Sequence, residues 1–311
     1  MSLSKIWLCG IVLLIIGNVD VLLWPPSYLS LLRAIGTPLI FYCILLDYRH
    51  TTNKKKFFST LIASNLAWGA LFILNLKYPL IFGTPFLFVD TNANILGSLL
   101  ATCAIIWLIE MYNTKTKKVI VLTCIMIISQ LVFLPIFIYI FNSLVSQGVT
   151  DSHLQVLELI SALLTVISLW FNAGGLFYVV MGLIIYFTML NKRLLFVSYS
   201  AFCLLYFVVL QFRIIPRLLT RLHYMIRLSS LPQGVMGVLT AMARNLVGSP
   251  AVFMVGEFSH LWDNYSWAMI FALVFMLLHN DGICSKHTTS KVKYAFFVSY
   301  PVILAFVVYL G

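Results

Sequence analysis

Long apolar runs, separated by short loops rich in lysine and arginine, recur along the whole of this sequence. Of the 311 residues, 62% are hydrophobic and only 9% are charged. Continuous apolar runs in such a composition are typical of a polytopic helical membrane protein, whereas a closed barrel would have short alternating segments. No polar stretch is long enough to fold by itself. The sequence therefore predicts one transmembrane domain, residues 1–311, that is all-α.

The first two apolar runs, Ile6–Trp24 and Tyr28–Leu46, flank a Trp-Pro-Pro turn and lead into a basic loop, residues 47–56. Each run is close to the ~20 residues that a helix needs to cross a ~30 Å hydrocarbon layer. Lysine and arginine beside a span resist translocation, so we expect this loop in the cytoplasm. The same rule explains the net charge of +11 without nucleic acid as a partner. An anionic lipid surface is the expected partner of these loops.

Further apolar runs predict a helical bundle with about nine transmembrane helices. The run Asn92–Glu110 predicts a fourth span and Leu194–Phe212 a later one. Residues 153–190 are too many for one crossing at about 1.5 Å per residue. Two crossings there would place Lys192 and Arg193 outside, whereas one crossing plus a partial segment would keep them inside. We expect the second arrangement.

Polar side chains at lipid depth are the main candidates for a functional site. The sequence has no Walker loop, GxGxxG element, HExxH helix or Cys/His metal spacing, so it predicts no metal site. Asn18, Asp20 and Arg33 lie in the first hairpin, and we expect them to face the middle of the bundle. Asp20 lies either at the headgroup boundary or in an ion pair with Arg33. Such a pair could orient a substrate or hold a general base.

Two further groups of polar residues have alternative interpretations. His50 follows a predicted span among basic neighbours and is either a solvated loop residue or a second candidate base. Arg213, Arg217 and Arg221 repeat at i, i+4 spacing. They form either a basic helix that lies on a lipid surface or a wall that binds an anionic substrate such as a nucleotide or phosphate.

Motifs at both ends of the chain and in the fourth span occur in an order that is found in a known family. They are Leu32-Arg33-Ala34-Ile35-Gly36 with Pro38, His50-Thr51-Thr52-Asn53-Lys54-Lys55-Lys56-Phe57, Asn92-Ala93-Asn94-Ile95-Leu96, His279-Asn280-Asp281-Gly282, Lys293-Tyr294-Ala295-Phe296-Phe297 and Tyr300-Pro301. In this order they resemble TraX-type membrane proteins. The resemblance covers residues 151–258 poorly.

The chain departs from the family at two histidines. Where the family's first span carries an Asp-His pair, the best-aligned residues here are Gly17 and Asn18. Two residues after the Tyr-Pro motif, where the family has a histidine, this chain has Ile303. Both histidines best suited to proton transfer are therefore absent.

The resemblance implies N-terminal acetylation of pilin subunits, with acetyl-CoA as the acyl donor, and a place in pilus or fimbrial biogenesis in the bacterial inner membrane. If the chain is active, the candidate donor contacts are Arg33, Arg213, Arg217 and Arg221, and the candidate base is Asp20 or His50. Because the family histidines are missing, the sequence leaves open whether the protein is a membrane-bound N-acetyltransferase. The alternatives are a non-catalytic scaffold or accessory subunit, and a small-solute transporter with discontinuous helices.

Overall fold

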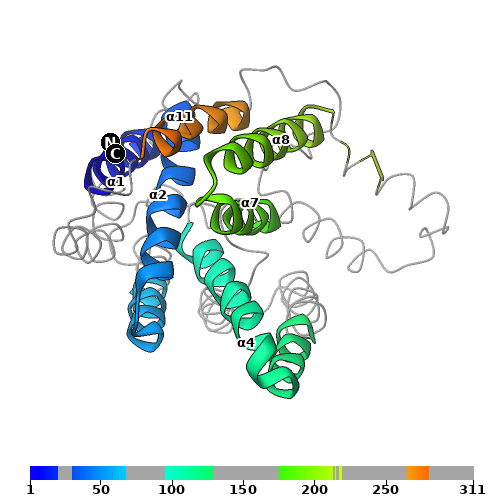
Figure 1. The fold of residues 1–311 in the computed structure, drawn as a ribbon. Helices are drawn as coiled ribbons and strands as arrows, with labels where there is room; N and C mark the ends of the chain where they lie inside the picture. The colour runs from blue at the N-terminus through cyan, green and yellow to red at the C-terminus, as the bar shows by residue number, and fades with distance from the viewer. Residues whose placement is uncertain are drawn as a thin grey trace, which may run out of the picture.

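The computed structural model describes residues 1–19, 30–67, 95–128, 175–212, 214, 217–218 and 265–279. Within these residues every regular element is helical, as the sequence predicts (Figure 1). The elements are α1 (Leu3–Val19), α2 (Ser30–His50), a helical segment over residues 54–67, α4 (Ile95–Ile128), α7 (Gly175–Thr188), α8 (Lys192–Gln211), the 3-10 helix η7 (Tyr265–Phe271) and α11 (Ala272–Leu277). The Trp-Pro-Pro turn and the motifs after His279 lie outside the described residues.

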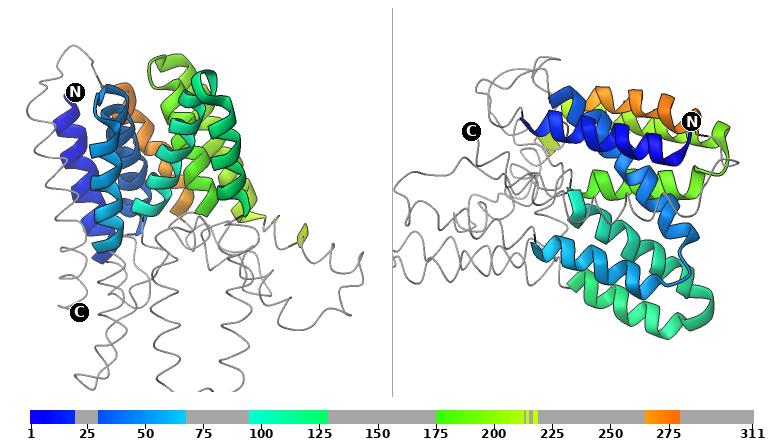
Figure 2. Two further views of the ribbon diagram at one scale, coloured as in Figure 1. Left: turned by 90° about the horizontal axis from the view of Figure 1, so that it is seen from below. Right: turned by 90° about the vertical axis from the view of Figure 1, so that its left-hand side faces the viewer.

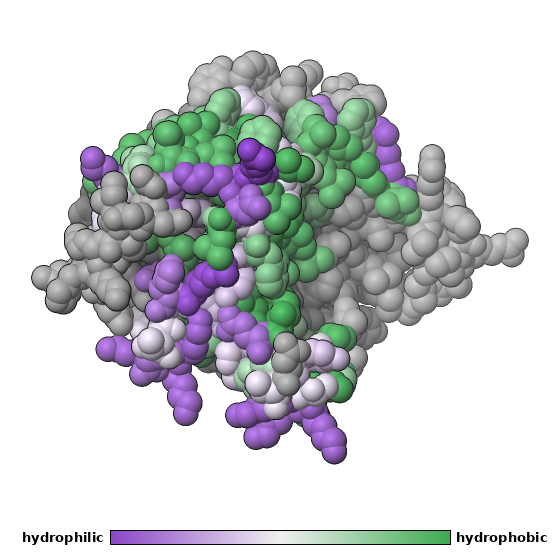
Figure 3. Space-filling view, in the orientation of Figure 1, coloured by the Kyte–Doolittle hydropathy of each residue, from purple (hydrophilic) through white to green (hydrophobic). Residues whose placement is uncertain are grey.

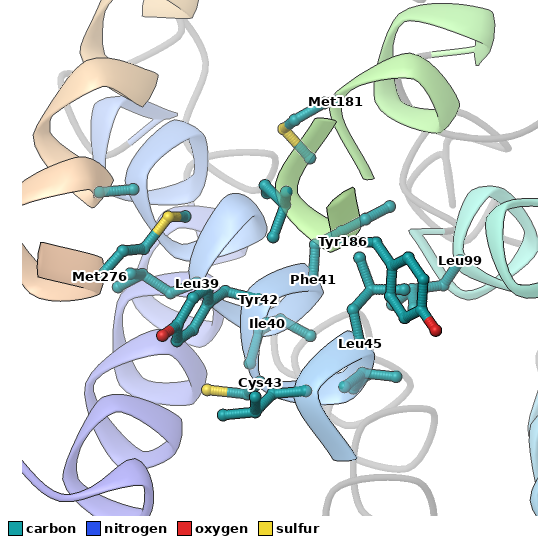
Figure 4. Packing of buried hydrophobic residues seen from close by; sticks show 14 of the residues in the cluster. Leu39, Ile40, Phe41, Tyr42, Cys43, Leu45, Leu99, Met181, Tyr186 and Met276 are labelled. Carbon is teal, nitrogen blue, oxygen red and sulfur yellow. The ribbon is translucent and has the colours of Figure 1, made fainter. Parts of the chain in front are cut away.

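The helix α2 is at the centre of the bundle. It packs against α1, α4, α7, η7 and α11. A much larger share of its residues is buried than of the residues of α8. Figure 4 shows side chains of α2 between Met276 of α11 on one side and Tyr186 and Leu99, from α7 and α4, on the other. A helix that is covered on several sides needs apolar residues around its whole circumference, not only along one stripe, and α2 has them.

Three glycines let α1 lie directly against α2. A Cβ atom on Gly36 would meet the Leu14 backbone nitrogen at 2.8 Å, and one on Gly17 would come closer still to the Arg33 backbone nitrogen, at 2.3 Å. A Cβ atom on Gly10 would meet side chains of α2, the nearest at 3.1 Å. Small residues allow helices to approach closely where lipid surrounds them. Since the end of α1 meets the beginning of α2, the two helices form the antiparallel hairpin that the sequence predicts.

The helices α2 and α7 run in the same direction. A Cβ atom on Gly182 of α7 would lie 3.0 Å from the ring of Phe41 in α2. One turn later in α7, the Tyr186 ring lies 6.1 Å from the ring of Tyr48, which follows Phe41 in α2. The later residue of one helix therefore meets the later residue of the other.

The first arm of α4 has this direction too, because Thr102 faces Gly182 and the later residue Glu110 is hydrogen-bonded to Tyr186. Residues 189–191 are then the short connection from α7 to α8. A connection this short makes α8 the antiparallel neighbour of α7.

The elements η7 and α11 run antiparallel to α8. The Tyr199 hydroxyl donates a hydrogen bond to the Met269 carbonyl at 3.0 Å. At the beginning of α8, the Lys192 ammonium donates to the His279 carbonyl, just after α11, at 2.8 Å. The beginnings of α1 and α8 and the ends of α2, α7 and α11 therefore meet at one end of the bundle.

The predicted basic loop after α2 is largely helical. The helix α2 continues to His50, and a new helix begins after Asn53. The Thr51 hydroxyl donates to the Asp47 carbonyl at 2.7 Å, and the Asn53 side-chain oxygen accepts the Lys56 N–H at 3.0 Å. Short polar side chains thus complete one helix end and cap the next. For this reason the connection is shorter than the charge pattern suggests.

The element α4 is a helical hairpin. Lys115 has non-helical dihedral angles (φ −143°, ψ 50°), and Figure 2 shows the two arms of α4 side by side. The turn comes shortly after Glu110, where the fourth span is predicted to end. Lys117 and Lys118 follow it, so this turn is basic like the connection after α2.

The α7–α8 connection lies at the end of the bundle where α2 ends, and the number of crossings in residues 153–190 stays a prediction because residues 153–174 lie outside the described residues. Arg49, at the end of α2, donates to the Tyr186 carbonyl at 3.3 Å, so Lys192 and Arg193 lie at the same end of the bundle as Arg49. The helix α7 has 14 residues. It rises about 21 Å, less than the ~30 Å of a full crossing.

Three of the described helices are long and apolar enough to cross a membrane: Leu31–His50, Ile95–Tyr112 and Lys192–Gln211. Shorter apolar helices cover Leu3–Gly17, Gly175–Thr188 and Trp267–Leu277. Large apolar side chains are exposed on α8, among them Phe196, Val197, Leu204 and Leu205. Such a surface suits contact with lipid.

Candidate functional site

Most of the described cations lie where α2, α7 and α11 end. We call this part of the molecule the basic end and the other the opposite end. The cations of the basic end are Lys5, Arg49, Lys54, Lys55, Lys56, Lys115, Lys117, Lys118, Lys192 and Arg193. Figure 3 shows hydrophilic residues beside apolar surface on the face in view. Cations gathered at one end of the helices are the arrangement that the positive-inside tendency predicts for a membrane protein.

The carboxylate of Glu110 joins three helices at the basic end. One oxygen, Oε1, accepts the Tyr186 hydroxyl of α7 at 2.5 Å, and Oε2 accepts the Tyr48 hydroxyl of α2 at 3.3 Å. Tyr48 is fully buried and Tyr186 is 7% exposed, whereas Glu110 is exposed. The two phenols thus direct their protons outward from the core onto one carboxylate at its edge.

Two cations bind the backbone of the same tyrosines. Arg49 donates to the Tyr186 carbonyl, and its guanidinium carbon lies 5.4 Å from the centre of the Tyr186 ring. Lys54 donates to the Tyr48 carbonyl at 2.5 Å, and its ammonium lies 3.6 Å from the centre of the Tyr48 ring. Both distances to the rings suit cation–π attraction. Desolvation lowers the pKa of Lys54 from its ordinary value of 10.5, and the Glu110 carboxylate opposes that shift.

Aromatic rings enclose this group of polar residues, which we call the Glu110 cluster (Tyr48, Arg49, Lys54, Glu110 and Tyr186). The Tyr48 ring meets the Phe57 and Phe58 rings edge-on at 5.3 and 6.0 Å, and Phe58 meets Trp107 at 6.1 Å. Rings at these separations pack favourably and keep water from the tyrosine side of the cluster. Chemically, the cluster is a set of matched charges and hydrogen bonds that holds α2, α4, α7 and the segment 54–67 together. No group of His, Cys, Asp and Glu within the described residues could hold a metal ion.

The two described histidines differ in exposure. His50 is exposed at the last residue of α2, so it is free to meet a solute at the basic end. His279 is 3% exposed, and its ring lies 5.7 Å from the Tyr42 ring. The His279 ring therefore packs deep against α2. Lys192 donates to the carbonyls of His279 and Leu277.

Arg33 lies at the opposite end, where α2 begins. The Thr37 hydroxyl, one turn later, donates to the Arg33 carbonyl at 2.9 Å, and the Thr37 and Tyr178 side chains are hydrogen-bonded. Arg33 is half-buried.

The structure separates the predicted site residues. Because each helical residue rises about 1.5 Å, His50 lies about 25 Å along α2 from Arg33. Arg217 is exposed and follows α8 at the end where Arg33 lies. Asp20, Arg213 and Arg221 lie outside the described residues, as does the side chain of Asn18. Within the described residues, the candidate base His50 and the candidate donor contacts Arg33 and Arg217 thus belong to different ends of the bundle.

The sequence interpretation missed the Glu110 cluster. One signal was available, since Glu110 is the acidic residue of the apolar run Ile95–Tyr112. A carboxylate near the end of such a run needs partners. The partners themselves come from α2 and α7, which are far away in sequence, and only the packing of the helices brings them together.

Comparison with protein-family models, with characterised proteins and with solved structures gives no match. The described residues define the class of the molecule: a helical protein in which three helices are long and apolar enough to span a membrane.

Proposed function

We propose that the chain is a polytopic protein of the bacterial inner membrane, with about nine crossings, that acts in pilus or fimbrial biogenesis. The order of its TraX-type motifs supports this proposal. So does the collection of basic residues at one end of the bundle, as the cytoplasmic surface of an inner-membrane protein requires. The partners in this proposal are the lipid bilayer and a pilin or fimbrial subunit.

The activity that we propose is N-terminal acetylation of a pilin subunit, with acetyl-CoA as the donor. The observation that carries it is the place of His50: an exposed imidazole at the end of the buried helix α2, among cations. Arg49 and Lys54 are engaged with Tyr186 and Tyr48. The exposed Lys55 is therefore the group best suited to attract the donor's phosphates.

In this transfer the pilin amine nitrogen forms a bond to the thioester carbonyl carbon, and the carbon–sulfur bond breaks. The ammonium of the pilin N-terminus must first lose a proton to become a nucleophile. His50 takes this proton as a general base and returns it to the departing thiolate, and the second proton that the nitrogen loses as the amide forms passes to water. Asp20, the other candidate base, would act from its own place in the chain, outside the described residues.

Mass spectrometry of a co-expressed pilin tests this activity. The wild-type chain is expected to give an acetylated pilin N-terminus, and His50→Gln to reduce the rate of acetylation by about 100-fold or more. Thr52→Ala, an exposed neighbour, is the matched control and is expected to leave acetylation unchanged. Asp20→Asn identifies the base if His50→Gln has no effect; unchanged acetylation in both variants would contradict a base at either residue.

A second candidate, a non-catalytic scaffold, is favoured by the packing of Gly17. This residue aligns best with the acidic residue of the family's Asp-His pair, and a Cβ atom there would lie 2.3 Å from the Arg33 nitrogen. No side chain fits at this distance, so a helix contact occupies the place of a catalytic group. The scaffold predicts normal pilus assembly with an unmodified pilin. Uptake of a small solute into proteoliposomes would instead favour transport.

A further inference from the structure

Two cations that flank His50 in sequence donate to carbonyl groups at the ends of helices. Arg49 of α2 donates to the Tyr186 carbonyl, in the last turn of α7, at 3.3 Å. Lys54 donates to the Tyr48 carbonyl, in the last turn of α2, at 2.5 Å. The carbonyls of a last turn lack helical donors and carry the negative end of the helix dipole. Since α7 has no basic residue in its own last turn, Arg49 supplies the cation that this helix end favours.

The contact of Arg49 with Tyr186 connects the end of α2 to a residue that is itself held. The Tyr186 hydroxyl donates to the Glu110 carboxylate of α4 at 2.5 Å. The Tyr186 ring lies beside the Arg49 guanidinium and meets the Tyr48 ring at 6.1 Å. The residue directly before His50 is therefore anchored to α7, and through Tyr186 to α4.

The chain after His50 is held as well. The Thr51 hydroxyl donates to the Asp47 carbonyl at 2.7 Å, and the Asn53 side-chain oxygen accepts the Lys56 N–H at 3.0 Å. These bonds complete the end of α2 and begin the next helix within a few residues. His50 thus lies in a short connection whose backbone is fixed on both sides.

The imidazole of His50 is left uncommitted by these contacts. It is exposed, and within the part of the chain that the structure describes it forms no hydrogen bond. Its neighbours make the contacts instead. An available ring on a fixed backbone is what a general base needs, because it must meet its substrate in one geometry without first breaking bonds of its own.

We propose that Arg49 and Lys54 are positioning residues for His50. Arg49 anchors the last turn of α2 to α7 and Lys54 caps it, so together they hold the exposed imidazole at one place on the basic end. The inference rests on the proposed function in one respect, the role of His50 as a base. The place of the imidazole can be measured without any acetylation.

Pulsed electron paramagnetic resonance on the purified full-length protein in detergent measures this place. Spin labels are attached to His50→Cys and to Phe196→Cys, at an exposed residue of α8, in a cysteine-free background. Arg49→Met is expected to broaden the distribution of distances between the labels, because α2 loses its bond to α7, the neighbour of α8. Lys192→Met is the matched control, since Lys192 caps a different helix end, at the Leu277 carbonyl of α11. It is expected to leave the distribution unchanged.

The kinetics of acetylation connect the place of His50 to the reaction. With acetyl-CoA and a peptide of the pilin N-terminus, Arg49→Met is expected to lower kcat about tenfold or more, because a misplaced base meets the amine less often in the reactive geometry. The KM for acetyl-CoA should stay the same. Arg49→Lys keeps a cation that can reach the carbonyl and should recover part of the loss. Lys192→Met should not change kcat.

Two results would overturn the inference. An unchanged distance distribution in Arg49→Met would show that its contact does not hold the end of α2. Equal broadening in Lys192→Met would show only a general loss of stability. If Arg49→Met does not give folded protein, Lys54→Met decides in the same way, and an unchanged distribution would again overturn the inference.

The two measurements also separate this inference from the proposed function. Broadening together with an unchanged kcat in an active protein would overturn positioning while acetylation stands. A wild-type chain that does not acetylate the peptide would contradict the proposed function, and the distance distributions alone would then decide whether Arg49 and Lys54 hold His50 in place.

Discussion

The Tyr186 hydroxyl donates to one oxygen of the Glu110 carboxylate at 2.5 Å while the Tyr48 hydroxyl donates to the other at 3.3 Å. These two contacts connect α7 and α2 through a single residue of α4. Arg49 and Lys54 donate hydrogen bonds to the backbone carbonyls of the same two tyrosines. The basic end is therefore stabilised by charged groups as well as by packing.

A double-mutant cycle on Glu110 and Tyr186 measures the strength of this connection. We expect Glu110→Gln and Tyr186→Phe each to lower the free energy of unfolding and to show a coupling energy of about 1 kcal/mol. The exposure of Glu110 keeps the value modest, because solvent screens the carboxylate. The cycle with Tyr48→Phe should give a smaller coupling, since that hydrogen bond is longer. Tyr112→Phe, at an exposed residue of the same helix, is the control and should be additive with Tyr186→Phe. Full additivity of Glu110→Gln with Tyr186→Phe would contradict the contact.

The titration of Lys54 should depend on Glu110. Burial lowers the pKa of Lys54 from 10.5, and the carboxylate opposes the shift, so Glu110→Gln is expected to lower the pKa of Lys54 further. NMR of isotopically dimethylated lysines as a function of pH measures this midpoint. A midpoint that does not move in Glu110→Gln would contradict the proximity of the two charges.

The same shift has a consequence for stability. A lysine with a lowered pKa in the folded state binds fewer protons there than in the unfolded state. The contribution of Lys54 to stability should therefore rise with pH between its folded pKa and 10.5. Denaturation of the wild type and of Lys54→Met across this range checks the sign. A wild-type stability that falls with pH relative to Lys54→Met would contradict it.

The α1–α2 contact predicts a graded series of glycine substitutions. Gly17→Ala and Gly36→Ala would place a Cβ atom 2.3 and 2.8 Å from backbone nitrogens, which cannot move independently of their helices. We expect each to destabilise the fold by about 1 to 3 kcal/mol, with Gly17→Ala at the upper end. Gly10→Ala meets side chains at 3.1 Å and beyond, so it is the milder control. Thermal unfolding in detergent gives the order, and a Gly10→Ala protein less stable than Gly17→Ala would be inconsistent with the packing.

Much of the architecture could be predicted because it depends on local composition. The first hairpin, the turn after Glu110 and the helix over 192–211 lie close to the predicted runs. The lengths of the apolar runs and the positions of lysine and arginine determine these features, and both can be read from a single sequence. The side chains of Thr51 and Asn53 shorten the connection after α2 through hydrogen bonds to the backbone, which hydropathy does not register.

The candidate site was harder to predict because it depends on which helices are neighbours. Arg33 and His50 belong to the same predicted hairpin, yet they are about 25 Å apart along α2. Tyr48, Glu110 and Tyr186 come from three distant runs and meet because α2, α4 and α7 run in one direction. The predicted pairing of Asp20 with Arg33 stays a prediction, since Asp20 lies outside the described residues.

The separation of a basic end from an arginine-bearing opposite end is tested most directly by side-specific labelling. Single cysteines replace Lys55, Arg193 and Arg217 in a cysteine-free background, and a membrane-impermeant maleimide is added to intact spheroplasts or to inverted vesicles. We expect Lys55→Cys and Arg193→Cys to react only in inverted vesicles and Arg217→Cys only in spheroplasts. Reaction of Lys55→Cys and Arg217→Cys from the same side would contradict the arrangement of the helices and the cytoplasmic place of His50 that follows from it.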